Sequence, residues 1–439
     1  MKVLLRTFGC RANHYDAEQV RALLTRAGAQ VVDTAPAGSE APGAVDRSPE
    51  VAVLTSCAVT ADAEADLRQA VRRLAREHPS MRVIVTGCAA ARSGERIAAL
   101  PNVAAVIPGA DLAATAAAVG LPDATVGDAT RTHAERQSTA RATLRVQDGC
   151  DEHCTFCATT LARGAHRSRA VASLVEEARA LSEHHAEIVL TGVHVGSWGT
   201  EDGRTLGSLV RALVDGTRKV RFRLASVEAT EVDAELAELL RDGGDRVCPY
   251  VHAPLQSGSD AVLRRMGRHW YTATTYARAI ERLTRDRAVF GLGGDVMTGF
   301  PGETDADHAA TMEMVRTLPF THLHVFPYSP RPGTPAARLG AEVPASVARA
   351  RAAEVRALAV EKSRAYATSR IGGAADLVVV SPPAPVPHPA SLPHPALRKC
   401  LTEDYLEVHA ETVAPRGTRF TTRLSEPMLF PPLPALRTE

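Results

Sequence analysis

Residues 150–157 read Cys150-Asp151-Glu152-His153-Cys154-Thr155-Phe156-Cys157, which places three thiols at the spacing C-x3-C-x2-C. Thiolates are soft ligands that suit zinc and iron–sulfur clusters. A closed zinc site needs four ligands, usually as two C-x2-C pairs, and no fourth partner follows here. Three cysteines on a four-iron cluster leave one iron free to bind a small molecule. The alternative is a buried helix face shared by positions i, i+4 and i+7; Asp148-Gly149 and the polar insert favour a loop instead.

The chain around this motif is of ordinary globular composition. It has 439 residues, of which 45% are hydrophobic and 23% charged, enough for about three domains. The formal net charge of +1 excludes a global positive field, so nucleic acid would be bound through a local patch. The short apolar start and the lack of a run of about 20 apolar residues argue against export and against a membrane span. We therefore expect a cytoplasmic protein whose eight cysteines are not a disulfide framework.

Alternating strand and helix patterns surround the motif from residue 141 to about 368. Strands are predicted at 142–147, 187–191, 220–225, 250–253, 292–297 and 322–326, and helices at 172–184, 205–214, 234–240, 272–285, 306–317 and 344–362. About six βα units predict a partial (β/α)6 barrel, in which chemistry belongs at the carboxyl ends of the strands. The cysteine motif and the loops at Thr191, Ser226, Gly299 and Pro327 all follow strands.

A second cysteine set lies in the first 122 residues. Strands at 3–8, 51–55, 82–86 and 103–107, with helices at 16–27 and 61–77, predict a doubly wound parallel sheet. Cys10, Cys57 and Cys88 each come one or two residues after a strand. The carboxyl ends of parallel strands share one edge of the sheet, so these thiols should converge. We expect a second three-cysteine cluster there, in preference to three unrelated buried thiols.

Two further segments complete the predicted organisation. Residues 123–140, with Arg131, His133, Arg136 and Gln137, lack apolar periodicity and are predicted to be a linker. Residues 369–439 are predicted to form a small β module, with strands at 377–380, 402–410 and 418–424. Surface loops are predicted at 35–50 and in the proline-rich stretch 382–395.

Motifs spread from residue 8 to residue 334 stand in the order found in one known family. They are Phe8–Asn13, Thr55–Glu64, Val85–Cys88, Val146–Cys150, Ala162–Gly164 with Arg167–Arg169, Leu190–Val193, Pro254–Gly258, Gly299–Thr304 and Phe326–Thr334. With both cysteine sets, the chain resembles the radical SAM methylthiotransferases. The C-terminal module resembles a shortened TRAM domain, the RNA-binding appendage of that family. Ala158–Leu161 and the proline-rich insert depart from the family pattern, the first beside the cluster and the second in the module expected to grip RNA.

The resemblance implies a radical SAM barrel, S-adenosyl-L-methionine (SAM) and two 4Fe-4S clusters, on Cys150, Cys154 and Cys157 and on Cys10, Cys57 and Cys88. Gly9–Tyr15, together with Cys57–Thr60, is most similar to the branch that adds a methylthio group to C2 of N6-threonylcarbamoyladenosine next to the tRNA anticodon. The implied partners are tRNA and an electron donor of flavodoxin or ferredoxin type, with a monomeric enzyme and no membrane. The alternatives are methylthiolation of isopentenyladenosine tRNA or of a ribosomal protein, and a non-catalytic iron–sulfur protein that binds RNA or senses redox state.

The same resemblance suggests roles for other side chains. SAM would contact Phe156, Thr191, Gly192, Ser226 and Glu228, although Phe156 would serve equally as a hydrophobic plug. Asn13, Arg163 and Gln256 would hold the second cluster or the substrate. Arg167 and Arg169 would contact phosphates or form a solvated surface pair. We expect His322 and His324 to line the core or a pocket without binding metal, His184-His185 to be a solvated helix end, and Cys248 and Cys400 to be plain thiols.

Overall fold

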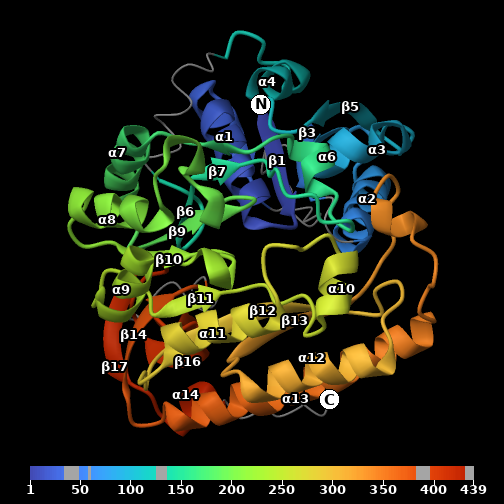
Figure 1. Ribbon diagram of the computed structural model, residues 1–439. Coiled ribbons are helices and arrows are strands. Elements are labelled where there is room, and N and C mark those ends of the chain that lie inside the picture. Colours follow the sequence, from blue (N-terminus) through green and yellow to red (C-terminus); the bar gives the residue numbers. More distant parts are fainter. Residues whose placement is uncertain (34–48, 58–60, 125–135, 382–395, 431–439) are drawn as a thin grey trace, which may run out of the picture.

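The computed structural model describes residues 1–33, 49–57, 61–124, 136–381 and 396–430 (Figure 1). The predicted loop at 382–395, most of the one at 35–50, and Arg131 and His133 of the predicted linker lie outside these ranges. No helix within them has both the length and the apolar character needed to cross a bilayer. The architecture is α/β, as expected, while the predicted domain boundaries stay predictions.

The N-terminal part is a five-stranded parallel sheet in the order β2-β1-β3-β4-β5. Its strands are β1 (Lys2–Phe8), β2 (Gln30–Val32), β3 (Val51–Ser56), β4 (Arg82–Gly87) and β5 (Val103–Pro108). Helices α1 (Arg11–Arg26) and α4 (Leu112–Val119) cover one face, and α2 (Ala61–Glu77) and α3 (Cys88–Ala98) the other. Every residue of β3 is buried, which explains its continuous apolar run. The doubly wound prediction is confirmed; β2, α3, α4 and the first turn of α1 were not predicted.

The central part contains six parallel strands with helices outside them. One sheet is β10-β9-β6, and the next is β11-β12-β13; a bridge between Ser226 and His252 joins them. The strands are β6 (Ala142–Arg145), β9 (Glu187–Thr191), β10 (Arg221–Leu224), β11 (Tyr250–His252), β12 (Gly291–Thr298) and β13 (His322–Pro327). The helices are α7 (Val171–Ser182), α8 (Leu206–Gly216), α9 (Ala234–Asp242), α11 (Ala273–Thr284), α12 (Asp305–Thr317) and α13 (Ala345–Ser369). Short elements between them are β7 (Gln147–Asp148), α6 (Thr159–Arg163), β8 (Arg167–Ser168) and α10 (Asp260–Arg265).

The C-terminal part is an antiparallel half-barrel with the strand order β16-β15-β14-β17. Its elements are β14 (Ala374–Val379), β15 (Ala396–Leu401), β16 (Glu407–Thr412), β17 (Arg419–Arg423) and α14 (Glu426–Leu429). The prediction of a strand over 402–410 is wrong in its first half: residues 402–406 form a turn, in which Tyr405 has φ +74°. Strand β15 was not predicted.

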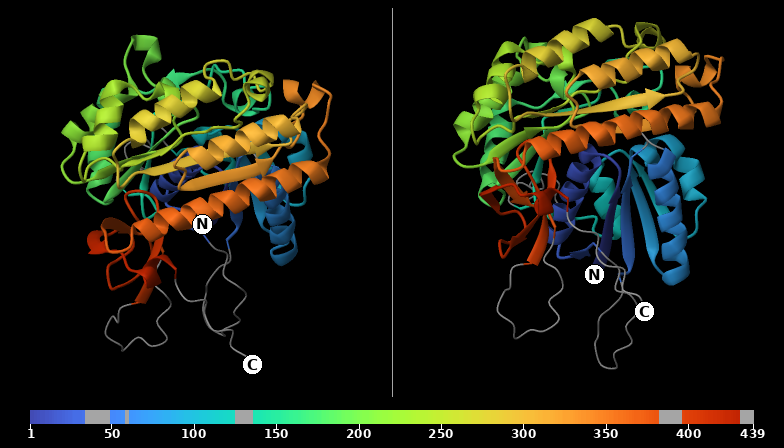
Figure 2. Two further views of the ribbon diagram at one scale, coloured as in Figure 1. Left: turned by 60° about the horizontal axis from the view of Figure 1, so that its bottom comes forward. Right: turned by 90° about the horizontal axis from the view of Figure 1, so that it is seen from below.

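Buried ion pairs attach this half-barrel to the amino-terminal ends of the barrel strands. Glu187 accepts from Arg221 at 2.6 Å and from Arg223 at 2.8 Å, and both guanidinium groups are almost fully buried. Arg221 also pairs with Asp376 at 3.0 Å, and Arg223 donates to the carbonyl oxygen of Thr402 at 2.8 Å. Figure 2 shows the N-terminal sheet and the half-barrel on the same side of the central barrel, beneath α13. Side chains from all three parts can therefore meet in the barrel.

Candidate iron–sulfur sites and barrel interior

The three N-terminal cysteines lie together at the carboxyl edge of the sheet. Gly9 and Gly87 precede two of them in left-handed conformations, φ +107° and +96°, and a Cβ on Gly9 would lie 2.1 Å from the Cβ of Cys57. A hydrogen bond with Cys57 lowers the pKa of the Cys10 thiol to about 6. Burial raises the pKa of Cys88, and the charge of Cys10 acts in the same direction. The structure thus brings these three thiols into one neighbourhood, as the strand-end argument predicts.

The Cys150 loop contains no helix, so the alternative of a shared helix face is wrong. Gly149 has φ +71°, and a Cβ there would lie 1.8 Å from the carbonyl oxygen of Ala165, so only glycine fits the start of the loop. A turn joins the N–H of Cys157 to the carbonyl of Cys154 at 3.0 Å. All three cysteines are half-buried.

Cationic side chains that we did not predict flank this loop. His194 Nδ1 lies 3.8 Å from Cys150 Sγ, and its Nε2 lies 2.7 Å from Glu231. Burial disfavours the charge on His194, but hydrogen bonds with Cys150 and Glu231 raise its pKa to about 10. Arg268 Nη1 donates to Cys154 Sγ at 3.7 Å. Positive charge therefore stands beside two of the three sulfurs. In the sequence, only the position of His194 after a barrel strand hinted at this role.

The residues predicted to bind SAM differ in their burial and in their contacts. Thr191 is buried at the end of β9, and a Cβ on Gly192 would lie 2.9 Å from Gln147, so both shape the strand end. Ser226 is exposed. Phe156 packs edge-to-face on Phe300 at a centroid distance of 6.4 Å, as the plug reading expects.

Glu228, also predicted to bind SAM, is already engaged inside the protein. Both of its carboxylate oxygens accept from Arg268, at 2.5 and 2.6 Å. Burial raises the pKa of Glu228 although Arg268 opposes it. The carboxylate thus holds the arginine that contacts Cys154.

Arg163 joins the two cysteine sets. Its Nε donates to Cys88 Sγ at 3.2 Å, and its Nη2 donates to Asn13 and Asp16, both at 2.7 Å. Its Nη1 donates to Asp148 at 3.1 Å, two residues before Cys150. Burial disfavours the charge, but Asp16 and the neighbouring acidic groups raise the pKa of Arg163 well above its ordinary value. Asn13 and Arg163, predicted near the second cluster, thus lie at the junction of the N-terminal sheet and the barrel.

The remaining predicted substrate residues differ in their surroundings. Arg169 donates to Glu177 at 2.6 Å and to Tyr15 at 3.1 Å, so its half-buried side chain joins α1 to α7 instead of forming a solvated pair. Arg167 has a side chain 61% exposed and donates to backbone carbonyls. Gln256 is buried with φ +60°, and its Oε1 has no hydrogen-bond partner in the described structure; the same holds for Nδ2 of Asn13.

The inner face of β11, β12 and β13 is polar. Asp295 Oδ1 lies 3.1 Å from His252 Nε2 and 3.2 Å from His324 Nδ1. These three ligand atoms lie within 4.8 Å of one another, a spacing that suits a cation, but the two imidazoles already satisfy the carboxylate. The His324 side chain is 59% exposed, so the interior is open to solvent. Burial lowers the pKa of neighbouring His322 to about 4, which keeps that ring neutral at physiological pH.

The floor of this interior is formed by residues from three parts of the chain. Tyr405 of the half-barrel stacks on Tyr250 of β11 with centroids 4.5 Å apart. The guanidinium of Arg223 lies 5.2 Å from the Tyr405 ring. Arg11, which follows Cys10 in α1, donates to the Tyr405 hydroxyl at 3.0 Å.

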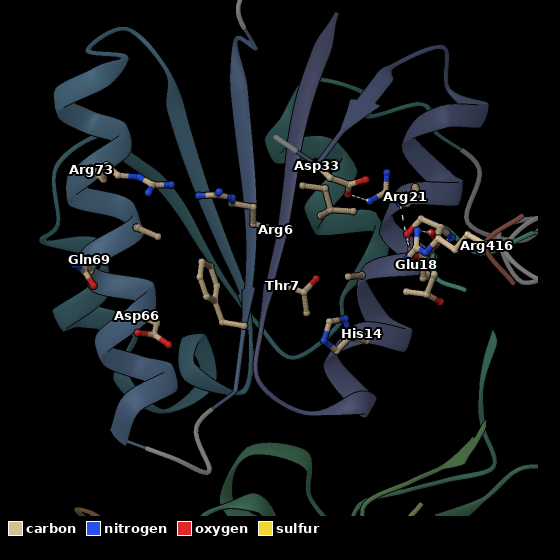
Figure 3. A pocket seen from close by; sticks show the side chains of 16 residues that line it. Arg6, Thr7, His14, Glu18, Arg21, Asp33, Asp66, Gln69, Arg73 and Arg416 are labelled. Carbon is tan, nitrogen blue, oxygen red and sulfur yellow. Dashed lines mark hydrogen bonds and ion pairs between the residues drawn. The ribbon is translucent and has the colours of Figure 1, made fainter. Parts of the chain in front are cut away.

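A separate surface pocket of about 690 Å³ runs along β1 between α1 and α2 (Figure 3). Its charged lining includes Arg6, Arg21 and Arg73 with Asp33 and Asp66, so neither sign of charge dominates. None of the six cysteines discussed above lines it.

Two family models and several curated relatives match this chain. Residues 2–109 match the model of the Uncharacterized protein family UPF0004, and residues 144–315 match that of the Radical SAM superfamily. Threonylcarbamoyladenosine tRNA methylthiotransferase MtaB of Thermotoga maritima is 32% identical over 382 residues, 84% of each chain. Its Bacillus subtilis counterpart is 33% identical, covering 83% of this chain and 82% of the relative. The tRNA-2-methylthio-N(6)-dimethylallyladenosine synthase of Erythrobacter litoralis is 32% identical over 85% of each chain.

A solved structure shares the fold at low sequence similarity. The radical S-adenosylmethionine methyltransferase TsrM of Kitasatospora setae, with cobalamin and a 4Fe-4S cluster bound, aligns with a TM-score of 0.54 at 16% identity. The alignment covers 76% of this chain and 77% of that one.

Proposed function

The chain belongs to the tRNA methylthiotransferases of the radical SAM superfamily, and we propose that within this family it adds a methylthio group to C2 of N6-threonylcarbamoyladenosine. The family uses SAM and two 4Fe-4S clusters. Relatives named for threonylcarbamoyladenosine and for dimethylallyladenosine match this chain at nearly the same identity, 32–33% and 32%. Overall identity therefore does not choose the substrate, and the choice must rest on the site.

The polar interior of the barrel supports the threonylcarbamoyl substrate. Its wall carries His252, Asp295, His322 and His324, and its floor carries Tyr405. A dimethylallyl group is an apolar hydrocarbon, so it would displace water from this solvent-open polar wall without replacing the hydrogen bonds that water makes to these groups, at a free-energy cost. A threonylcarbamoyl group brings a urea, a hydroxyl and a carboxylate, which can satisfy them. This polarity is the observation on which the substrate choice depends.

The residues present fit two clusters. We propose that Cys150, Cys154 and Cys157 hold one, and Cys10, Cys57 and Cys88 the other. Each set has a cation within hydrogen-bonding reach of a sulfur: burial raises the pKa of Cys88 and of Cys154, and the charges of Arg163 and Arg268 oppose that effect. The unpartnered amide atoms of Asn13 and Gln256 are what a site awaiting its ligands would present.

The bound cofactors supply radical chemistry, which C2 of adenine requires because it bears no acidic proton. The chain itself holds the sulfurs in place through Arg163 and Arg268 and presents a polar wall to the substituent on N6. Thr191, Gly192 and Ser226 remain our proposed SAM contacts.

The substrate assignment is tested by the tRNA nucleosides of a deletion strain. We expect 2-methylthio-N6-threonylcarbamoyladenosine to disappear and its unthiolated precursor to accumulate. Loss of the 2-methylthio form of isopentenyladenosine, with the threonylcarbamoyl nucleosides unchanged, would contradict the assignment.

The cluster assignment has its own test in anaerobically reconstituted protein. Replacing Cys10, Cys57 and Cys88 by alanine should lower iron from about eight to about four atoms per chain, since one four-iron cluster is lost. SAM cleavage under reduction should persist, supported by flavodoxin or ferredoxin. Wild-type protein that forms no 5′-deoxyadenosine would instead indicate a non-catalytic iron–sulfur protein.

A further inference from the structure

Arg11 is a cation with no anionic partner in the part of the chain that the structure describes. Its guanidinium is partly buried, and among the described residues its one hydrogen-bond partner is the neutral phenol of Tyr405, at 3.0 Å. No carboxylate in the described ranges forms an ion pair with it. A charge removed from water without a partner is costly, so such a group calls for an explanation. One explanation is that a ligand brings the missing charge.

The surroundings of Arg11 have no carboxylate to spare. Glu187 serves three guanidinium groups, with contacts of 3.3 Å to Arg141, 2.6 Å to Arg221 and 2.8 Å to Arg223. Arg223 also lies close to the ring of Tyr405. Asp376 is a second carboxylate of this network, and Arg221 and Arg419 share it. Among the described residues the guanidinium groups of the network therefore outnumber its carboxylates, and Arg11 adds to this excess of positive charge. An anionic group at this point would be attracted by the whole floor as well as by Arg11.

The position of Arg11 points this charge toward the reaction centre. Cys10 and Arg11 are consecutive, so their Cα atoms are about 3.8 Å apart. The cysteine reaches the thiol cluster at the sheet edge, while the arginine reaches Tyr405 on the barrel floor. A nucleoside whose base faces the second cluster would thus extend its N6 substituent toward the floor.

Tyr405 is prepared for a ligand in the same way. Its backbone has φ +74°, a conformation that costs a bulky residue free energy and that clusters at functional sites. Stacking on Tyr250 fixes the ring, and the hydroxyl that accepts from Arg11 keeps its own proton to donate. Arg11 has further N–H groups available because one hydrogen bond occupies one of five.

We propose that Arg11 and the Tyr405 hydroxyl form a carboxylate-binding subsite that holds the amino-acid carboxylate of an N6-substituted adenosine. The proposal rests on the proposed function, since a dimethylallyl group has no carboxylate. The subsite explains in chemical terms how this chain would distinguish the two classes of substrate.

The test compares two synthetic anticodon stem-loops, one carrying threonylcarbamoyladenosine and one carrying its neutral carboxamide. With wild-type holoenzyme, kcat/KM for the carboxylate should exceed that for the carboxamide by about 10- to 100-fold, the range of one charged hydrogen-bonded contact. In Arg11→Gln, kcat/KM should fall for the carboxylate substrate alone, so that the ratio is lost. Arg11→Lys should keep part of the ratio. Arg6→Gln is the matched control: it removes a cation from the neighbouring strand that lines the surface pocket, and it should leave the ratio unchanged.

Each other outcome has a definite meaning. Equal losses on both substrates in Arg11→Gln would show a phosphate or structural contact and overturn the proposal, as would no loss at all. Tyr405→Phe keeps the aromatic stack and lies outside the cluster sites, so it tests the subsite if Arg11 variants fail to retain iron; we expect a smaller loss, again confined to the carboxylate. Wild-type enzyme that modifies a dimethylallyladenosine stem-loop but neither of these two would refute the proposed function instead.

Discussion

Replacing Arg163 by glutamine should weaken both the attachment of the N-terminal sheet to the barrel and the environment of the second cluster. The side chain is 7% exposed and donates to Cys88, Asn13, Asp16 and Asp148. Removing one partner of a buried ion pair costs about 3–5 kcal/mol because the other charge is left behind. Asp16 keeps its 2.5 Å contact with Arg145, which places the expected loss near the lower end, about 3 kcal/mol.

The loss of stability is measured by urea unfolding of the apoprotein, and the second effect by redox titration of the holoenzyme followed by electron paramagnetic resonance. A cation beside Cys88 Sγ stabilises the more negative, reduced cluster, so its removal should lower the reduction potential of that cluster. Loss of an interaction worth about 1.4 kcal/mol would lower a one-electron potential by about 60 mV. The potential of the cluster on Cys150, Cys154 and Cys157 should stay unchanged.

The matched control is Arg167→Gln, four residues along the same segment. Arg167 has a side chain 61% exposed and donates to backbone carbonyls, so this change should cost less than about 0.5 kcal/mol and move neither potential. If the two variants behaved alike in stability and potential, the inference that Arg163 joins the two sites would be wrong.

Other substitutions test the scaffold. Glu187→Gln should cost about 3–5 kcal/mol in the free energy of urea unfolding, because it leaves buried guanidinium groups unpaired. Arg211→Gln, at an exposed pair with Glu235, should cost under about 1 kcal/mol. Similar values for the two variants would count against the role of the buried network. Gly149→Ala should prevent reconstitution of the cluster on the Cys150 loop, seen as the loss of about four irons per chain, and normal iron content would contradict the clash with Ala165. Burial lowers the pKa of His185 to about 4, below its unfolded value near 6.5. Between these pH values the unfolded chain binds more protons than the folded chain. The free energy of unfolding should therefore fall by about 3 kcal/mol as the pH drops from 6.5 to 4. His185→Gln should flatten that fall, measured as the urea midpoint at pH 7 and pH 5, and an unchanged slope would contradict it.

The sequence predicted features that depend on local spacing and on strand order. The C-x3-C-x2-C motif and the glycine before it specify a ligand loop, and the position of Cys10, Cys57 and Cys88 after parallel strands predicts their convergence. The alternation of strands and helices predicts the parallel N-terminal sheet and the parallel barrel, because parallel strands are buried on both faces by the helices that connect them. These features need no knowledge of which distant side chains meet.

What the sequence could not show are contacts between residues far apart in the chain. His194 and Arg268 next to the Cys150 loop, and the engagement of Glu228 by Arg268, arise only when separate strand ends come together. The expectation that His185 is solvated is wrong for the same reason: it is 6% exposed and accepts from the backbone N–H of Gln137 at 3.0 Å.

The turn at 402–406 was missed for a different reason. The alternating polarity of these residues is typical of a strand. The positive φ of Tyr405 could not be predicted, because that position is not a glycine. A residue that breaks a local rule in this way is more informative once the structure is known, since such strain persists where the surroundings enforce it.

Helix α1 connects the proposed site of the second cluster to the proposed carboxylate subsite on the barrel floor. Its first turns carry Cys10 toward the thiols, Arg11 toward the barrel floor, and Asn13 and Asp16 toward Arg163. Asn13 and Asp16 are three residues apart and so share a helix face, which one guanidinium bridges to the loop before Cys150. Any movement of α1 relative to the barrel must therefore displace the sulfur ligand and the carboxylate subsite together. A substrate anchored on Arg11 would in turn stabilise the placement of Cys10, because the two residues are consecutive at the N-terminus of α1 and a ligand that fixes one favours the position that both require.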